Sequence, residues 1–269
     1  MCSICAIENK KDDDFVGLFN EGEIDKFLRK IYNQEVTKRS LDIEYYYKVA
    51  DFIMKGVYNG FGKDSLSVVW GTPDFDMLKS LKENVYIFSA AKNYQQTREI
   101  GTMLSTENGI KPFDVFKKEA SKVFATYNEN YLRAEYNSAI AQARSARNWM
   151  EIEKDVDVFS QLQYETAGDG RVRPEHVSLD GMVRPVNDKF WDKYYPPNGW
   201  NCRCIVLQVN DLPNSDMRKF KTPTEKEVPE IFQFNAGKTK QIFSEKHPYF
   251  EVAKWDKEFA KQNFNMPLP

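Results

Sequence analysis

The pattern that most limits the fold is a change of periodicity near residue 155. Before this point, apolar residues recur every three or four positions, as on the buried stripe of an amphipathic helix. After it, short β-branched and aromatic runs alternate with Gly, Pro and Asp, which is typical of short strands joined by irregular segments. The chain is therefore predicted to be α+β, with a helical N-terminal part followed by a small α+β module with short antiparallel strands.

Apolar stripes in the first part predict four helices, at residues 21–31, 40–58, 72–105 and 111–153. Ser40 has the side chain of a typical N-cap, so the second helix is expected to start there. Gly56, Gly60 and Gly62 are expected to break the end of that helix because glycine is a poor helix former. In the fourth helix a pause is expected at Asn128.

The second part contains fewer regular elements. Strands are predicted at residues 158–166 and 202–209, and a short strand that enters a turn at 232–238. The segment 169–204 between the first two strands looks too polar and too irregular for a regular element. The predicted organisation is a flexible leader, a helical region, the α+β module, and a C-terminal helix and tail, at residues 1–20, 21–154, 155–250 and 251–269.

Composition excludes several classes of protein. The 269 residues carry a formal net charge of −2, so a nucleic-acid contact would need a local basic patch. No apolar run reaches the roughly 20 residues of a membrane helix. The first residues lack the apolar core of a signal peptide, so we expect a cytoplasmic protein without a membrane partner.

Four cysteines are too few for a disulfide scaffold in a chain of this size. Cys2 and Cys5 form a CxxC pair, which suits a metal knuckle or a redox pair. No βαβ pattern surrounds this pair, as a thioredoxin-like redox site would require. We therefore interpret both residues as exposed thiols near a frayed chain end.

A second group of soft ligands lies in the α+β module. Cys202 and Cys204 are two residues apart at the predicted start of a strand, so their side chains should share one face. With His176 they could supply three ligands of a tetrahedral structural zinc site. The alternative is two small buried residues and a hydrogen-bonded histidine. The sequence does not single out a fourth ligand among Asp169, Asp180 and His247.

The sequence supports a catalytic or phosphate-binding site less well than a zinc site. A nucleophilic cysteine beside His176 would need an orienting group and an oxyanion donor, and no signature for either is present. Gly237-Lys238-Thr239 resembles the end of a phosphate loop, but Phe232 stands where that motif needs glycine. No catalytic residue is assigned.

An aromatic group surrounds the Pro196-Pro197 pair. Its rings could stack on bases, with arginines contacting phosphates, or could pack together and stabilise an irregular loop. Packing is favoured because Asp and Glu residues interleave with the arginines and offset their charge. The aromatic residues are Phe190, Trp191, Tyr194, Tyr195 and Trp200.

Three motifs in this order and spacing carry a family resemblance: Arg173-Pro174-Glu175-His176, then Leu179-Asp180-Gly181, then Pro196-Pro197-Asn198-Gly199-Trp200-Asn201-Cys202-Arg203-Cys204. Together they resemble the Mu F-like phage head morphogenesis family, the MuF minor head proteins. The likeness covers roughly residues 110 to 250, and it includes the helix that carries Arg133 and Glu135. Some relatives have a cysteine in place of His176 and a histidine in place of Gly199.

The resemblance implies a phage or prophage minor head protein that acts in capsid and head morphogenesis and is not an enzyme. It would be associated with the portal or lie inside the capsid. The implied partners are portal and capsid proteins, with packaged DNA as a further candidate, and the implied locations are the virion and, during assembly, the host cytoplasm. The alternative from another class is a metal-dependent hydrolase or nuclease-like effector that uses His176 with Cys202 and Cys204.

Overall fold

The computed structural model describes residues 18–107, 109–215 and 228–269. These residues form two compact units. The first takes in the chain up to Ile53, Tyr86–Glu135 and Pro248–Pro269, and the second comprises Met54–Val85 and Tyr136–His247. Cys2, Cys5 and nearly all of the predicted leader lie outside the described residues. The predicted division of the chain at residue 155 stays a prediction.

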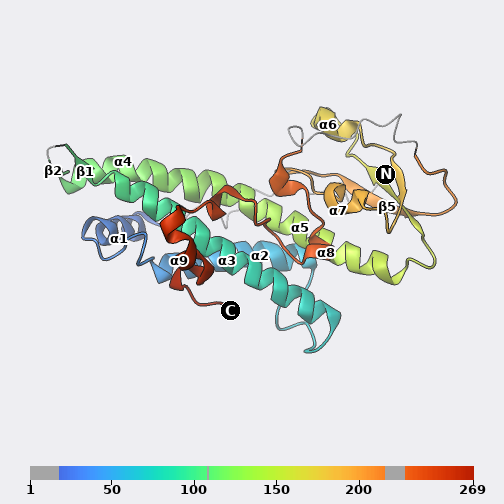
Figure 1. Cartoon of the computed structure of the whole chain (residues 1–269), viewed down its shortest axis with the longest axis horizontal. Helices are drawn as coiled ribbons and strands as arrows, with labels where there is room; N and C mark the ends of the chain where they lie inside the picture. Colours follow the sequence, from blue (N-terminus) through green and yellow to red (C-terminus); the bar gives the residue numbers. More distant parts are fainter. Residues whose placement is uncertain (1–17, 108, 216–227) are drawn as a thin grey trace. The chain divides into compact units, whose positions relative to one another are not determined.

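Five long helices account for most of the regular structure in the described residues: α1 (Glu21–Tyr32), α2 (Ile43–Phe61), α3 (Pro73–Thr102), α4 (Phe113–Ala125) and α5 (Leu132–Lys154) (Figure 1). Helix α1 starts where the sequence predicts because Asn20 and Glu23 form a reciprocal capping box. Helix α3 ends at Thr102, before the predicted limit at residue 105. A hairpin of two very short strands follows it. The hairpin pairs β1 (Ser105–Thr106) with β2 (Gly109–Ile110).

Helix α2 differs from its prediction at both ends. Asp42 caps it by accepting a hydrogen bond from the Tyr45 backbone N–H at 2.8 Å, so the expected cap at Ser40 is wrong. Gly56 and Gly60 lie inside the helix and do not break it. A Cβ at Gly60 would come within 2.1 Å of the Ile140 carbonyl oxygen on α5. The glycines therefore let two helices approach closely, which outweighs their low helix propensity.

The pause expected at Asn128 is a π-helical segment, η1 (Thr126–Tyr131), between α4 and α5. The wider π turn changes the backbone hydrogen bonding, and buried side chains supply partners around it. Asn128 donates to the Phe124 carbonyl at 2.9 Å, and Lys92 Nζ donates to the Tyr127 carbonyl at 2.7 Å.

Lys92 is also fully buried against a carboxylate. Its Nζ lies 2.8 and 2.9 Å from the two carboxylate oxygens of Glu135, which also accepts a hydrogen bond from the Tyr249 hydroxyl at 2.9 Å. Burial lowers the pKa of Lys92 and raises that of Glu135, and their mutual attraction opposes both shifts. Because every charge is paired and hydrogen-bonded, the group can exist in the core.

A three-stranded antiparallel sheet forms the framework of the module, in the order β4 (Val183–Pro185), β3 (Gln161–Glu165), β5 (Ile205–Val209). Gln163 on the central strand lies opposite Val183 on one side and Leu207 on the other. Together with the helices, this sheet confirms the predicted α+β class. The segment 169–204 is more regular than predicted, because it contains β4, α6 (Pro174–Val177) and α7 (Phe190–Tyr194).

The strand predicted at residues 232–238 is wrong. The chain there forms a 3-10 turn, η2 (Glu230–Phe232), and a short helix, α8 (Ala236–Thr239). The Asn235 side chain caps that helix by accepting from the backbone N–H groups of Gly237 and Lys238. The predicted C-terminal helix is divided into shorter pieces: η3 (Pro248–Phe250), η4 (Lys254–Asp256), α9 (Lys257–Lys261) and η5 (Asn263–Asn265).

Apolar and aromatic side chains from β3, α7 and the end of α5 form the core of the module. Trp191 is fully buried and its indole N–H donates to the Pro185 carbonyl at 2.9 Å. This arrangement confirms that the aromatic group packs internally. Among the described helices, none combines the length and the apolar composition that a membrane crossing requires.

Candidate metal centre

The loop from Pro196 to Cys204 is fixed by hydrogen bonds at its base. Ser145 Oγ on α5 donates to the Pro196 carbonyl at 2.6 Å, and the Pro196-Pro197 peptide bond is cis. Asn198 is buried, and its side-chain oxygen accepts from the Tyr164 hydroxyl at 3.2 Å. Its amide nitrogen lies within 3.4 Å of the Phe232 carbonyl. These contacts hold the loop before it reaches the cysteines.

The next three residues direct the chain toward the cysteines. Arg173 donates to the Trp200 carbonyl at 2.7 Å, and a Cβ at Gly199 would lie 3.1 Å from the Arg173 guanidinium. Asn201 follows with a φ of 55°, in the left-handed region that asparagine tolerates better than most residues. The strand β5 begins at Ile205, so both cysteines precede it and the predicted start at residue 202 is wrong.

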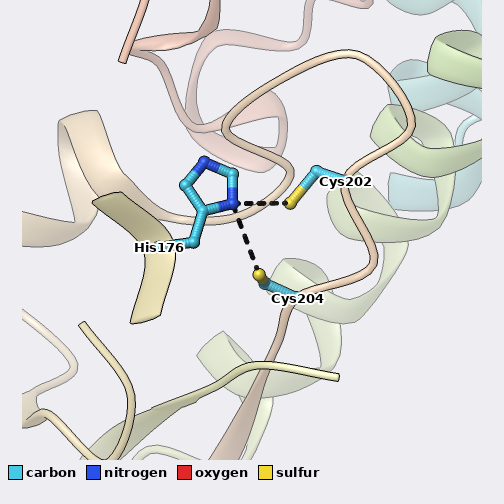
Figure 2. A group of neighbouring side chains, drawn as sticks. All are labelled: His176, Cys202 and Cys204. Atoms are coloured by element: carbon cyan, nitrogen blue, oxygen red, sulfur yellow. Dashed lines mark hydrogen bonds between the residues drawn. The ribbon is translucent and has the colours of Figure 1, made fainter. Parts of the chain in front are cut away.

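His176 comes from the short helix α6, which begins at Pro174, where a fixed φ suits the first helical turn. The histidine is 2% exposed. Its Nδ1 atom faces both cysteine sulfurs (Figure 2) and lies 3.7 Å from Cys202 Sγ and 3.6 Å from Cys204 Sγ. All three potential ligand atoms lie within 4.8 Å of one another. The structure therefore brings the three residues singled out from the sequence into one cluster.

The two thiols differ in electrostatic environment. The hydrogen bond from Cys204, followed by that with His176, lowers the pKa of Cys202 well below its usual value although burial opposes the shift. The same hydrogen bond to Cys202, together with burial, raises the pKa of Cys204. The pKa values of the two coupled thiols are therefore shifted in opposite directions.

The cluster fits the donor set and spacing of a zinc site. Tetrahedral zinc with Zn–N about 2.1 Å and Zn–S about 2.3 Å separates nitrogen and sulfur ligands by about 3.6 Å. The two Nδ1–Sγ distances match this value. His176 Nε2 is buried and has no hydrogen-bond partner in the described part of the chain. A metal-bound histidine usually has such a partner on its second nitrogen.

None of the three candidates for a fourth ligand joins this cluster. Asp169 accepts two hydrogen bonds from Arg203, at 2.6 and 2.7 Å, which hold the pKa of its carboxyl far below the usual range. Asp180 accepts from the backbone N–H and the hydroxyl of Thr166. His247 packs edge-on against Trp200.

Apart from Arg173, which binds the Trp200 carbonyl, the arginines of the motif region pair with neighbouring acids, as the interleaved sequence predicts. Arg171 lies 3.2 Å from Asp169, and Arg184 lies 3.6 Å from Asp188. The sequence interpretation overlooked Tyr164, whose pKa is raised by burial and by the nearby Cys202 and Cys204 sulfurs. The period-two alternation of the strand could have predicted its burial, because Tyr164 and Leu162 share one buried face of β3.

Comparisons with known proteins agree with the resemblance carried by these motifs. Residues 80–207 match the family described as Phage Mu protein F like protein, so the resemblance is confirmed for this part of the chain. The chain is 44% identical over 75 residues to the putative capsid assembly protein F of Escherichia phage Mu, an alignment that covers 28% of this chain and 17% of that protein.

Two further relatives match over shorter or weaker alignments. The Mu-like prophage FluMu F protein of Haemophilus influenzae is 34% identical over 58 residues, which cover 22% of this chain and 14% of that protein. An uncharacterized protein of Methanocaldococcus jannaschii is 24% identical over 190 residues, which are 70% of this chain and 27% of that protein. The chain thus spans less than a third of the length of each relative. No solved structure matches it.

Proposed function

We propose that this chain, whose residues 80–207 match the Mu F-like family, acts in the assembly of a phage or prophage head as a minor head protein. The observation that carries the proposal is the matched stretch itself, which ends at the Pro196–Cys204 loop and β5. The name of the phage Mu relative, a putative capsid assembly protein, supports the same role. The proposal is of a structural role, without catalysis, at the portal or inside the capsid.

The partners in this proposal are portal and capsid proteins. The module suits protein docking because its irregular loops are held by internal hydrogen bonds and ion pairs. Arg203 binds Asp169 through two hydrogen bonds, and Arg173 holds the Trp200 carbonyl. A surface that is already ordered loses little conformational entropy when a partner binds.

Co-sedimentation tests the head-assembly proposal. A tagged copy of the chain, expressed during head assembly, should sediment with procapsids that contain portal. A matched copy with Asn198→Ala should lose much of this association, because Asn198 fixes the Pro196–Cys204 loop. A tagged copy that stays in the soluble pool while heads form normally would contradict the proposal.

A structural zinc ion held by His176, Cys202 and Cys204 is part of the proposal. It would pin α6 to the chain segment that precedes β5, and its charge would favour both thiolates. The support is the donor set and the match of the nitrogen–sulfur distances to tetrahedral zinc. Such a site contributes directly to folding, so loss of metal should loosen the module.

Elemental analysis of the purified chain tests this part separately. We expect one zinc per chain in the wild type and in the Cys2→Ser/Cys5→Ser control. The Cys202→Ser/Cys204→Ser variant should lose the metal and melt at a lower temperature. Retention of zinc by that variant, or metal-free wild-type protein that melts at the same temperature with and without added zinc, would refute the site.

The rival function is a metal-dependent hydrolase or nuclease-like effector. One observation favours it: the described residues supply three ligands, which is the number that catalytic zinc sites use when one position is open. Incubation of the zinc-loaded chain with nucleic acid and ester substrates distinguishes the two functions. Turnover that disappears in His176→Ala, with the fold retained, would support the rival, whereas the structural role predicts no turnover.

A further inference from the structure

Two of the five tryptophans are strongly exposed, and one of them lies among cations. Trp255 on η4 is 72% exposed. Lys38 Nζ lies 5.8 Å from the centroid of its ring, a distance at which a cation and an indole attract each other. Trp70 is 82% exposed but lies in a loop where the neighbouring Lys63 is paired with Asp74. Trp255 therefore has an electrostatic setting that Trp70 lacks.

The backbone around Trp255 is held in place. Arg39 donates to the Trp255 carbonyl at 3.0 Å and forms an ion pair with the buried Asp256 at 2.5 Å. Asp256 also accepts from the Tyr94 hydroxyl at 2.6 Å and lies 3.3 Å from Lys38 Nζ. The buried Asp256 carboxylate thus fixes the backbone of η4, while the Trp255 indole remains exposed to solvent.

The charges near this ring are mostly positive. Residues 254–261 and the pair Lys38 and Arg39 contain three more cations than carboxylates. Glu258 is paired with Lys261 at 2.6 Å, and Asp256 is paired with Lys38 and Arg39. Lys254 and Lys257 are exposed and have no ion-pair partner among the described residues. We name Lys38, Lys254, Trp255 and Lys257 the Trp255 patch.

We propose that the Trp255 patch binds single-stranded nucleic acid. An exposed indole offers a face on which an unpaired base can stack, and flanking lysines can contact the phosphates on either side. The chain as a whole is slightly acidic, so an anionic ligand is directed to a local patch of this kind. A duplex keeps its bases stacked and would use the lysines alone.

An anionic membrane fits less well, because surface insertion normally uses several apolar side chains on one face. In the Trp255 patch, one ring supplies all of the apolar surface. The inference rests on the surroundings of Trp255 and does not depend on the head-assembly proposal. A negative result for nucleic-acid binding would therefore not contradict the head-assembly proposal, and the reverse also holds.

Fluorescence anisotropy with a labelled oligothymidylate of about 12 nucleotides tests the inference on the full chain. If three lysines contact phosphates, a plot of the logarithm of the association constant against the logarithm of the salt concentration should have a slope of about −2. Trp255→Ala should weaken binding about tenfold without changing this slope, because it removes stacking only. Lys254→Ala/Lys257→Ala should weaken binding and bring the slope to about −0.7.

Matched controls lie outside the patch. Trp70→Ala removes an indole that is even more exposed, and Lys118→Ala/Lys122→Ala removes two exposed lysines of α4; both variants should bind like the wild type. No binding at low salt, or equal losses in the Trp70 and Trp255 variants, would overturn the inference. So would tighter binding to a duplex, or to vesicles containing phosphatidylserine, than to the single strand.

Discussion

Replacement of Gly60 by alanine tests the close approach of α2 and α5. A Cβ at this position would lie 2.1 Å from the Ile140 carbonyl oxygen and within 3 Å of two further backbone atoms of Ile140. Because backbone atoms cannot rotate away, the helices must separate locally. The contact between Gly56 and Tyr136 and the 2.7 Å hydrogen bond from Arg147 to the Phe61 carbonyl would then loosen.

The size of the effect follows from two opposing terms. Overpacking of a well-packed core usually costs about 1–3 kcal/mol, and a backbone clash should lie near the upper end. Alanine in a helix is favoured over glycine by about 1 kcal/mol. We therefore expect Gly60→Ala to lower the free energy of unfolding by about 2 kcal/mol.

Urea unfolding followed by circular dichroism measures this change, and Gly101→Ala is the matched control. Gly101 also lies in a helix, but a Cβ there would meet nothing within 4 Å. The control should be unchanged or stabilised by up to about 1 kcal/mol. If both variants unfold at the same urea concentration, or Gly60→Ala is the more stable, the reasoning about the helix crossing is wrong.

Two further predictions concern buried charges. Burial raises the pKa of Asp256, but the hydrogen bond from Tyr94 and the charges of Lys38 and Arg39 outweigh it, so the folded pKa is lowered. Its stabilising effect should be complete above about pH 4 and fall as acid protonates it, a dependence that Asp256→Asn should flatten in thermal melts across pH. Lys92→Met should lower the free energy of unfolding, measured with urea, by about 3–5 kcal/mol because it leaves the Glu135 charge unpaired. The double variant Lys92→Met/Glu135→Leu should recover part of this loss.

Local sequence signals were sufficient for the long helices. The apolar stripe predicts α1, and the pause expected at Asn128 coincides with the π segment. They were insufficient where a distant partner decides the structure. Gly56 and Gly60 looked like helix breakers, because nothing local reveals that α5 passes next to them. Gly237 is a similar case, since a Cβ there would meet the Trp149 side chain at 2.3 Å.

The cluster of His176, Cys202 and Cys204 was predicted from residue type and order, and the structure brings its members together. The cysteines do not share a strand face as predicted. They precede β5, and the loop that Asn198 and Arg173 fix brings them together. Both residues belong to the family motifs, but their positions in the sequence do not reveal that they fix this loop. Their importance depends on contacts with Tyr164 and Trp200, which only the folded chain brings close.

The π-helical segment η1 sets the rotation of the helix that follows it. An α-helix advances by about 100° per residue, so the additional residue in a π turn rotates everything after it by about that angle. Glu135 follows η1 and accepts a hydrogen bond from Lys92, so the direction of its side chain depends on this rotation. Deletion of one residue between Thr126 and Tyr131 would keep the composition of the helix almost unchanged yet turn the carboxylate away from its ammonium. In this part of the chain the number of residues, more than their identity, specifies which side of the helix faces inward.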